Sequence, residues 1–197
     1  MHMRFWTSDL HFGHKNIIEY TGRPFSSTEE MDEELIRRWN SVLTLGDTVW
    51  FLGDFSLDWK KLAILNRLNF AKFDWILGNH DDKKKILREL KTGGCISNLV
   101  DKLTIHEGGL VDIDGVNFVV THAPLDALFD SPILCGHVHE KWRYCAAGTI
   151  LTEEGRNRLV RRKRTLHPAI NVGVDAHDFY PITDSKIMEI YNKISSY

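Results

Sequence analysis

Five short apolar runs, each followed by a polar turn, are the feature that most constrains the fold of this chain. They cover residues 3–8, 48–52, 74–77, 116–121 and 132–135. The runs are rich in β-branched and aromatic residues and almost continuous in hydrophobicity, which is typical of strands buried on both faces.

Helical patterns alternate with these runs. Ser27-Thr28-Glu29-Glu30 is a capping-box pattern and predicts a helix that extends to about Asn40. Further helices are predicted over residues 59–68, 82–90 and 184–194, and residues 102–120 predict consecutive strands joined by a hairpin. The alternation of strands and helices predicts an α/β fold. We expect one domain over residues 1–197.

Composition and charge exclude several classes of protein. With 43% hydrophobic and 26% charged residues, the chain is neither collagen-like nor disordered. A formal net charge of -2 gives no overall field that would attract nucleic acid or membrane. The three cysteines lack CxxC spacing, which argues against a disulfide framework and a thiolate zinc site. No apolar run approaches the roughly 18 residues of a membrane span. We therefore expect a soluble cytoplasmic protein, of an oligomeric state that the sequence does not indicate.

Residues able to bind a metal follow every one of the five runs. They are Asp9, His11, Asp54, Asn79, His122, His137 and His139. Taken singly, each pattern is typical of a surface turn or of a hydrogen-bonded histidine. Ligands gather at the carboxyl ends of strands in α/β sheets, so the whole set predicts one site. His137 and His139 carry extra weight, because alternate residues of a strand point the same way.

The predicted ligands combine carboxylate, amide and imidazole groups without thiolate. This set suits hard or borderline divalent metals such as manganese, iron, cobalt, nickel or zinc. The candidates are too many for one tetrahedral ion and suit two ions that share a carboxylate. Such a pair, roughly 3.5–4 Å apart, activates a bridging water and holds phosphate oxygens during in-line attack.

The order Asp-x-His, Gly-Asp, Gly-Asn-His-Asp, His and Gly-His-x-His resembles the calcineurin-like metallophosphoesterases. The resemblance covers nearly the whole chain, and residues 8–18, 23–25, 47–55, 122–125 and 171–178 are similar to a small phage or bacterial branch. It implies a sandwich of two β-sheets flanked by helices, with the metals at one end. It also implies hydrolysis of a phosphodiester or phosphomonoester by a metal-bridging hydroxide, with manganese the first choice of metal.

The resemblance implies a role for each matching residue. Asp9, His11 and His139 would hold one ion, Asn79, His122 and His137 the other, and Asp54 would bridge them. His80 would stabilise the transition state or protonate the leaving oxygen, and Asp81 would orient and charge its imidazole.

Two further residues have two interpretations each. His14 contacts substrate phosphate or caps the following helix. Arg23 binds substrate phosphate or forms an ion pair within a loop.

Residues 140–168 form an insertion that shorter relatives lack, with six basic residues at 156, 158 and 161–164. They are typical of a patch that grips the phosphates of a nucleotide or nucleic acid, or of the solvated face of a hairpin. Three functions therefore stay open: a phosphoesterase acting on a small ester, a nuclease or end-processing phosphatase that uses the insertion, and a non-catalytic metal-binding scaffold.

Overall fold

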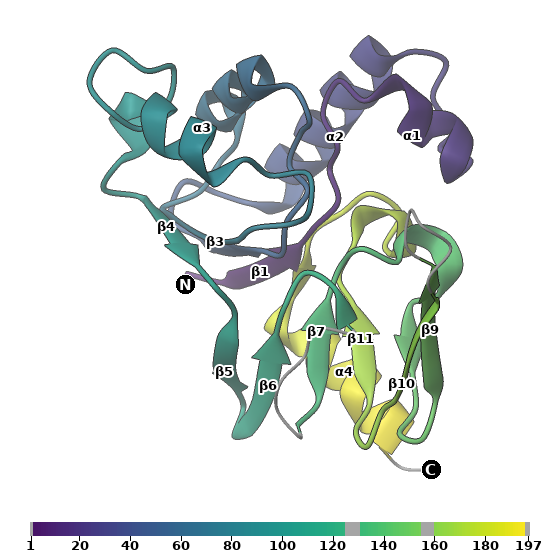
Figure 1. Cartoon of the computed structure of the whole chain (residues 1–197). Helices are drawn as coiled ribbons and strands as arrows, with labels where there is room; N and C mark the ends of the chain where they lie inside the picture. Colours follow the sequence, from purple (N-terminus) through teal and green to yellow (C-terminus); the bar gives the residue numbers. More distant parts are fainter. Residues whose placement is uncertain (1, 125–130, 155–159, 196–197) are drawn as a thin grey trace.

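The computed structural model describes residues 2–124, 131–154 and 160–195. Two five-stranded mixed sheets form its framework. Figure 1 shows the first sheet between a layer of helices and the second sheet. This confirms the α/β fold that the alternation of strands and helices predicts, and the sandwich of two sheets with flanking helices that the family resemblance implies.

The first sheet has the strand order β12-β1-β2-β3-β4. Its strands are β1 (Arg4–Thr7), β2 (Thr48–Phe51), β3 (Lys72–Ile76), β4 (Leu103–His106) and β12 (Ile182–Thr183). The strands β1 to β4 are parallel, and β12 runs antiparallel to β1. The carboxyl ends of β1, β2 and β3 therefore lie at one edge of the sheet.

The second sheet has the order β5-β6-β7-β11-β8. Its strands are β5 (Gly109–Ile113), β6 (Val116–Val120), β7 (Ile133–Cys135), β11 (Ala169–Asn171) and β8 (Tyr144–Cys145). The central strands β6, β7 and β11 are parallel, and β5 and β8 pair antiparallel at the edges. The predicted hairpin is β5–β6. Strand β4 belongs to the other sheet, so residues 102–120 pass from one sheet to the next.

The helices are α1 (Lys15–Tyr20), α2 (Thr28–Val42), α3 (Lys83–Glu89) and α4 (Asp184–Ser195), with short 3-10 helices η1 (Trp59–Arg67), η2 (Ser97–Leu99), η4 (His139–Lys141) and η5 (Val174–Ala176). The Ser27 hydroxyl accepts a hydrogen bond from the Glu30 N–H at 3.1 Å, which confirms the predicted cap of α2. The predicted helix over residues 59–68 is the 3-10 helix η1.

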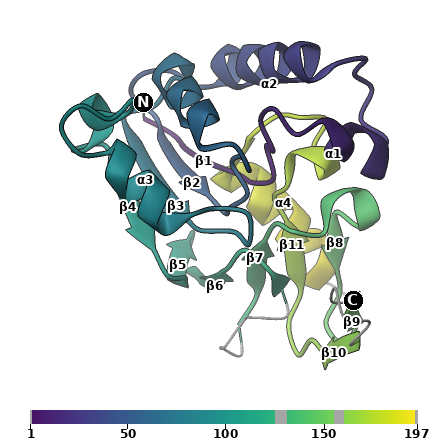
Figure 2. The ribbon, with the colours of Figure 1, turned by 45° about the horizontal axis from the view of Figure 1, so that its top comes forward.

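Two large clusters of apolar side chains fill the layers, beside two smaller ones among the described residues. One joins α2 and η1 to the first sheet through residues such as Leu35, Trp39, Phe51 and Phe73. The other joins both sheets to α4 and contains Trp6, Leu134, Ile170 and Ile187. Figure 2 shows α2 and α3 on the helical side of the first sheet. No helix of the described residues is both long enough and apolar enough to cross a bilayer.

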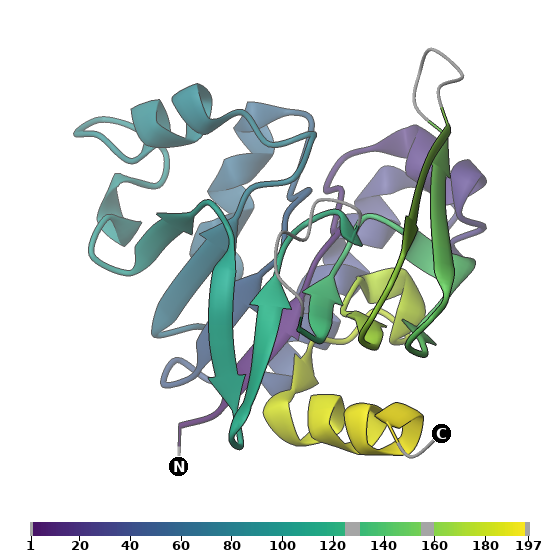
Figure 3. The same cartoon turned by 60° about the horizontal axis from the view of Figure 1, so that its bottom comes forward.

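The insertion contains a separate two-stranded ribbon of β9 (Ile150–Glu154) and β10 (Val160–Arg164), seen beside the second sheet in Figure 3. Its strands are antiparallel, with Arg164 opposite Ile150. Arg156 and Arg158 lie outside the described residues. The Arg164 side chain is exposed and donates to the Gly148 carbonyl at 3.2 Å.

Candidate metal centre

The loops that follow the parallel strands of both sheets meet at one place. Ser8, just after β1, forms an isolated bridge with Gly173, just after β11. The Asp9 N–H donates to the Gly53 carbonyl at 2.9 Å, which ties the end of β1 to the end of β2. Polar residues that are far apart in sequence are thereby brought together at the carboxyl ends of the strands, as predicted.

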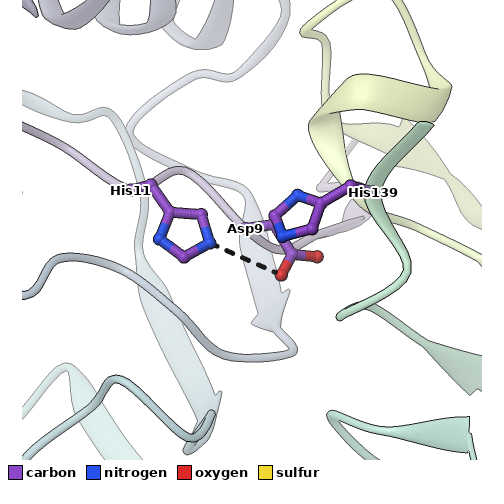
Figure 4. Close-up of side chains that lie close together, drawn as sticks. All are labelled: Asp9, His11 and His139. Atoms are coloured by element: carbon purple, nitrogen blue, oxygen red, sulfur yellow. Dashed lines mark ion pairs between the residues drawn. The ribbon is translucent and has the colours of Figure 1, made fainter. Parts of the chain in front are cut away.

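The first ligand cluster consists of Asp9, His11 and His139 (Figure 4). One ligand atom from each residue lies within 4.8 Å of the others. The Nε2 atom of His11 is 4.0 Å from Asp9 Oδ1, and the rings of His11 and His139 are 5.2 Å apart. Asp9 and His11 are buried and His139 is half-buried.

The second ligand cluster consists of Asp54, His122 and His137, again with one ligand atom from each within 4.8 Å of the others. The Nδ1 atom of His137 is 3.2 Å from Nε2 of His122. Asn79 adjoins this cluster, since its Oδ1 atom is 3.0 Å from the same His122 nitrogen. The structure therefore places all seven predicted ligands in or beside two neighbouring clusters.

Asp54 lies between the two clusters. Its Oδ2 atom is 3.5 Å from Nε2 of His11 in the first cluster and 3.4 Å from Nε2 of His122 in the second. The other oxygen, Oδ1, accepts the His80 N–H at 2.9 Å. One carboxylate oxygen therefore reaches histidines of both clusters.

The orientation of His137 and His139 has a cause different from the predicted one. Strand β7 ends at Cys135, so neither histidine is a strand residue and strand alternation does not orient them. Both have left-handed backbone conformations, with φ of 70° and 50°. The turn sends His137 to the second cluster and His139 to the first.

Left-handed backbone is common to most of the predicted ligands. Besides those two histidines, it is found at Asp9 (φ 59°), His11 (φ 51°) and Asp54 (φ 62°). This conformation is unfavourable for residues other than glycine and persists where the surroundings hold it in place. The strain is concentrated where the side chains must turn inward.

Two glycines make room for this arrangement. A Cβ atom on Gly78 would lie 2.6 Å from the Asp54 nitrogen, and one on Gly136 would lie 2.5 Å from Asp9 Oδ2. Both distances are well inside van der Waals contact with atoms that are fixed by hydrogen bonds. The glycines of the Gly-Asn-His-Asp and Gly-His-x-His motifs therefore allow close approach of backbone to ligand side chains.

In the second cluster, atoms that carry lone pairs face one another. A bound cation or a proton between them would remove their mutual repulsion. A carbonyl oxygen only accepts, so the 2.7 Å contact of His122 Nδ1 with the Leu52 carbonyl places the proton on Nδ1. Nε2 of a neutral His122 is then an acceptor, and it faces the oxygens of Asp54 and Asn79. Burial alone would lower the pKa of His122, but the Asp54 carboxylate offsets this and raises it to about 9.

Buried polar atoms without hydrogen-bond partners indicate that the first cluster also fits a cation. Asp9 Oδ1 and both ring nitrogens of His11 are buried without a hydrogen-bond partner. Burial lowers the pKa of His11 to about 2, so its ring is neutral and able to ligate. Buried polar atoms normally have partners, and leaving them without one is costly. The residues of both clusters therefore fit divalent metal ions.

His80 and His14 lie beside the first cluster. Their ring centres are 5.5 Å and 5.6 Å from that of His11. His14 occupies the cap position of α1, but its side chain makes no capping hydrogen bond. Its Nδ1 atom is buried without a partner. The structure thus contradicts the capping interpretation of His14, and contact with substrate phosphate stays a prediction.

Asp81 accepts several hydrogen bonds from the loops around it. Its Oδ2 atom accepts from the N–H groups of Asp54 and Gly78 and from the Trp75 indole, at 2.8, 2.9 and 3.1 Å. Its Oδ1 atom accepts the Phe55 N–H at 3.0 Å. These four donors occupy the carboxylate. Asp81 therefore anchors the two loops that carry Asp54 and Asn79, and its role of orienting the His80 imidazole stays a prediction.

Arg23 is engaged by protein groups. Its Nε and Nη2 atoms donate to Asp175 at 2.7 and 2.9 Å, while Nη1 and Nη2 donate to the carbonyls of Leu10 and Asp9 at 3.0 and 2.7 Å. The side chain has no exposed surface. Arg23 therefore forms the loop ion pair that was one of its two predicted roles, and a substrate phosphate does not reach it in this conformation.

Asp175 was not predicted as a site residue. Its Oδ2 atom lies 2.9 Å from His139 Nδ1, and it also accepts from Arg23. Burial raises its pKa, but these two partners lower it to about 2. The rule that located the ligands did not find it, because Asp175 follows strand β11 by four residues and that short strand is not among the five apolar runs. Asn171, at the end of that strand, donates to the carbonyls of His139 and Trp142 at 2.8 and 2.9 Å.

No family model matches the sequence. Among solved structures, that of the protein of unknown function AQ665 from Aquifex aeolicus has a TM-score of 0.63 and 20% identity, covering 96% of this chain and 100% of that one. A structure described as a novel archaeal phosphodiesterase has a TM-score of 0.45 and 19% identity, covering 86% and 82%.

Sequence relatives cover most of the chain. The uncharacterized protein MJ1445 of Methanocaldococcus jannaschii is 31% identical over an alignment of 193 residues that covers 94% of this chain and 89% of that protein. The Gene 66 protein of Mycobacterium phage L5 is 30% identical over 183 residues, covering 87% and 86%. The chain belongs to the family of MJ1445 and the mycobacteriophage Gene 66 proteins, and it has the two-sheet fold and paired His/Asp clusters that its resemblance to the calcineurin-like metallophosphoesterases predicts.

Proposed function

We propose that this protein is a phosphoesterase that depends on two divalent metal ions and hydrolyses a phosphodiester or phosphomonoester. The observation that carries the proposal is the position of Asp54, whose Oδ2 atom reaches a histidine of each cluster. A shared carboxylate between two imidazole-rich ligand sets is suited to a pair of ions and not to two independent structural sites.

Asp9, His11 and His139 would hold one ion, and Asn79, His122 and His137 the other, with Asp54 shared. When bound, the ions supply Lewis-acid stabilisation of phosphate oxygens and a water of lowered pKa. The absence of thiolate among these ligands favours manganese, iron, cobalt, nickel or zinc. Manganese is our first choice for supporting activity.

His80 is our candidate for the group that protonates the leaving oxygen. Its ring lies beside the first cluster without belonging to either ligand set. Its backbone N–H donates to Asp54 Oδ1, which fixes the residue relative to the shared carboxylate. A proton supplied to the leaving alkoxide in the transition state contributes about 10²- to 10⁴-fold to the rate. His14, whose ring centre is 5.6 Å from that of His11, is a candidate contact for substrate phosphate.

A recess of about 520 Å³ beside His80 gives the leaving group a place to lie. Asn79, His80 and the lysines Lys83, Lys84 and Lys85 line it. Asp81 and Asp82 line it as well, and two of the lysines are paired, Lys83 with Glu107 at 3.0 Å and Lys85 with Asp82 at 3.3 Å. The charge of the recess therefore does not select among phosphate esters, and nucleotides and nucleic-acid ends stay among the candidate substrates.

The direct test is hydrolysis of an aryl phosphodiester and an aryl phosphomonoester by the purified protein with manganese and each of the other metals. We expect turnover of at least one ester, and its loss on chelation. Asp54→Asn should abolish turnover. The control His2→Ala should leave turnover unchanged, because His2 is exposed and precedes the start of β1, at the end of the strand away from the site. A folded, metal-loaded protein that hydrolyses neither ester would contradict the proposal and favour the metal-binding scaffold.

A further inference from the structure

A single buried ion pair supports all three residues of the first cluster. Asp175 bonds directly to His139 at 2.9 Å. Its partner Arg23 donates to the carbonyls of Asp9 and Leu10, on the left-handed turn that contains Asp9 and His11. The side chains of Arg23 and Asp175 are 0% and 3% exposed, so water competes little for these bonds.

The contact with Asp175 also selects the ring nitrogen of His139 that faces the cluster. An ionised carboxylate only accepts hydrogen bonds, so the proton of a neutral His139 ring lies on Nδ1. Its Nε2 atom then carries the free lone pair. A carboxylate partner on the far nitrogen makes an imidazole a stronger ligand and fixes its ring plane.

The second cluster is supported by different means. The corresponding partner of His122 is a neutral group, the Leu52 carbonyl, at 2.7 Å. Asp54 is held by backbone contacts around His80 and Asp81. The described side-chain contacts of Arg23 and Asp175 outside their own pair are with Thr21, Met31, Phe179, Asp9, Leu10 and His139, and none of these belongs to the second cluster.

We infer that Asp175, tied down by Arg23, is a positioning residue for the first cluster alone, and that the protein thereby holds its two ions by separable means. The inference rests on the proposed function for the presence of two ions, but not on hydrolysis. It goes beyond the ligand set, because it assigns a role to Asp175, which lies in the 171–178 segment and is not a predicted ligand.

The test compares manganese binding by the wild type, Asp175→Asn and Asp184→Asn. The asparagine at 175 has one accepting oxygen for the two donors His139 and Arg23 and presents an amide to the other. Asp184→Asn is the matched control, since Asp184 also accepts from an arginine (Arg4, 3.0 Å) and from a ring nitrogen (Trp6, 2.6 Å), but at the start of α4.

Titration calorimetry and electron paramagnetic resonance give readouts other than turnover. For Asp175→Asn we expect one site weakened by about 10- to 100-fold and the other retained. At limiting manganese, the electron paramagnetic resonance spectrum of the wild type should be that of a coupled ion pair. The spectrum of Asp175→Asn should be that of an isolated ion. Asp184→Asn should bind both ions as the wild type does, even where its melting temperature is lower.

Two results would overturn the inference: two ions bound by Asp175→Asn with wild-type affinities, or both sites weakened equally. A wild type that binds no divalent ion would overturn it together with the proposed function. Selective loss of one ion from Asp175→Asn, in a protein whose wild type hydrolyses no phosphate ester, would support the inference and contradict the proposed function.

Discussion

The two ligand clusters contain the same kinds of residue, one aspartate and two histidines each, but the protein holds them differently. The first cluster depends on a buried arginine–carboxylate pair contributed by residues 23 and 175. The second depends on backbone groups, chiefly the Leu52 carbonyl and the turn anchored by Asp81. Similar ligands with different supports should respond differently to mutation, which makes the comparison testable.

The largest effect is expected where the clusters meet. Asp54→Asn replaces the carboxylate that reaches both His11 and His122 by an amide with a single oxygen. We therefore expect both sites to lose affinity for metal. The loss should exceed the roughly 10- to 100-fold that follows from removing a residue that only contacts a ligand. Turnover should fall below detection. Metal content after dialysis and hydrolysis of the aryl diester measure this.

Asp74→Asn is the matched control, because Asp74 is equally buried but pairs with Lys72 and His106 away from the site. Retention of both ions by Asp54→Asn would show that the two clusters are independent.

A smaller effect, on rate alone, is expected at a residue outside both clusters. His80→Asn should lower kcat by about 10²- to 10⁴-fold because the leaving oxygen loses its proton donor. Metal stoichiometry should not change, since the ring of His80 belongs to neither ligand set. Steady-state kinetics on diesters with good and poor leaving groups provide the measurement. An equal loss for both leaving groups would rule out proton donation as the role of His80.

The third prediction tests how closely the backbone packs against a ligand of the first cluster. Gly136→Ala would place a Cβ atom 2.5 Å from Asp9 Oδ2, so we expect a loss of about 1–3 kcal/mol in stability together with weaker binding of one ion. In the control Gly46→Ala, the new atom meets the exposed ring of His2, which is free to move. Chemical denaturation and manganese titration of both variants would show whether close packing at Gly136 matters.

The last prediction concerns the acid sensitivity of the loop that carries Asp175, and it affects stability without changing a ligand. His177 donates to the Asn171 carbonyl at 2.7 Å, and burial lowers its pKa to about 4. Arg143 and Lys186 act in the same direction, and Asp178 opposes them. The ring is neutral in the folded state, so its contribution to stability is complete above the unfolded pKa of about 6.5 and is lost as the pH falls toward 4.

The loss is on the order of 3 kcal/mol for a shift of this size. Denaturation of the wild type and His177→Gln between pH 7.5 and 4.5 should therefore give a steeper decline for the wild type. Parallel curves would contradict this account of His177.

The sequence predicted the strands and the ligands for a shared physical reason. Buried parallel strands must be apolar along their length, so a polar residue such as Asp54 or His122 marks the point where a strand ends. The carboxyl ends of parallel strands meet, and the order of the motifs was therefore sufficient to predict where the ligands gather. The division of His137 and His139 between clusters came from the family resemblance.

Other features depend on backbone geometry that residue patterns do not specify. The left-handed turn at His137 and His139 is one example, and the backbone donors that surround Asp81 are another. The pairing of Arg23 with Asp175 joins positions 152 residues apart, and neither lies in an apolar pattern that would locate it. Asp175 follows the short strand β11, which the five apolar runs did not include.

The most direct test of the account is the anomalous diffraction of crystals grown with manganese. The account predicts two peaks, roughly 3.5–4 Å apart. One should lie among Asp9, His11 and His139 and the other among Asp54, His122 and His137, with the Asp54 carboxylate in contact with both. A single peak, or none at these residues under saturating manganese, would contradict it.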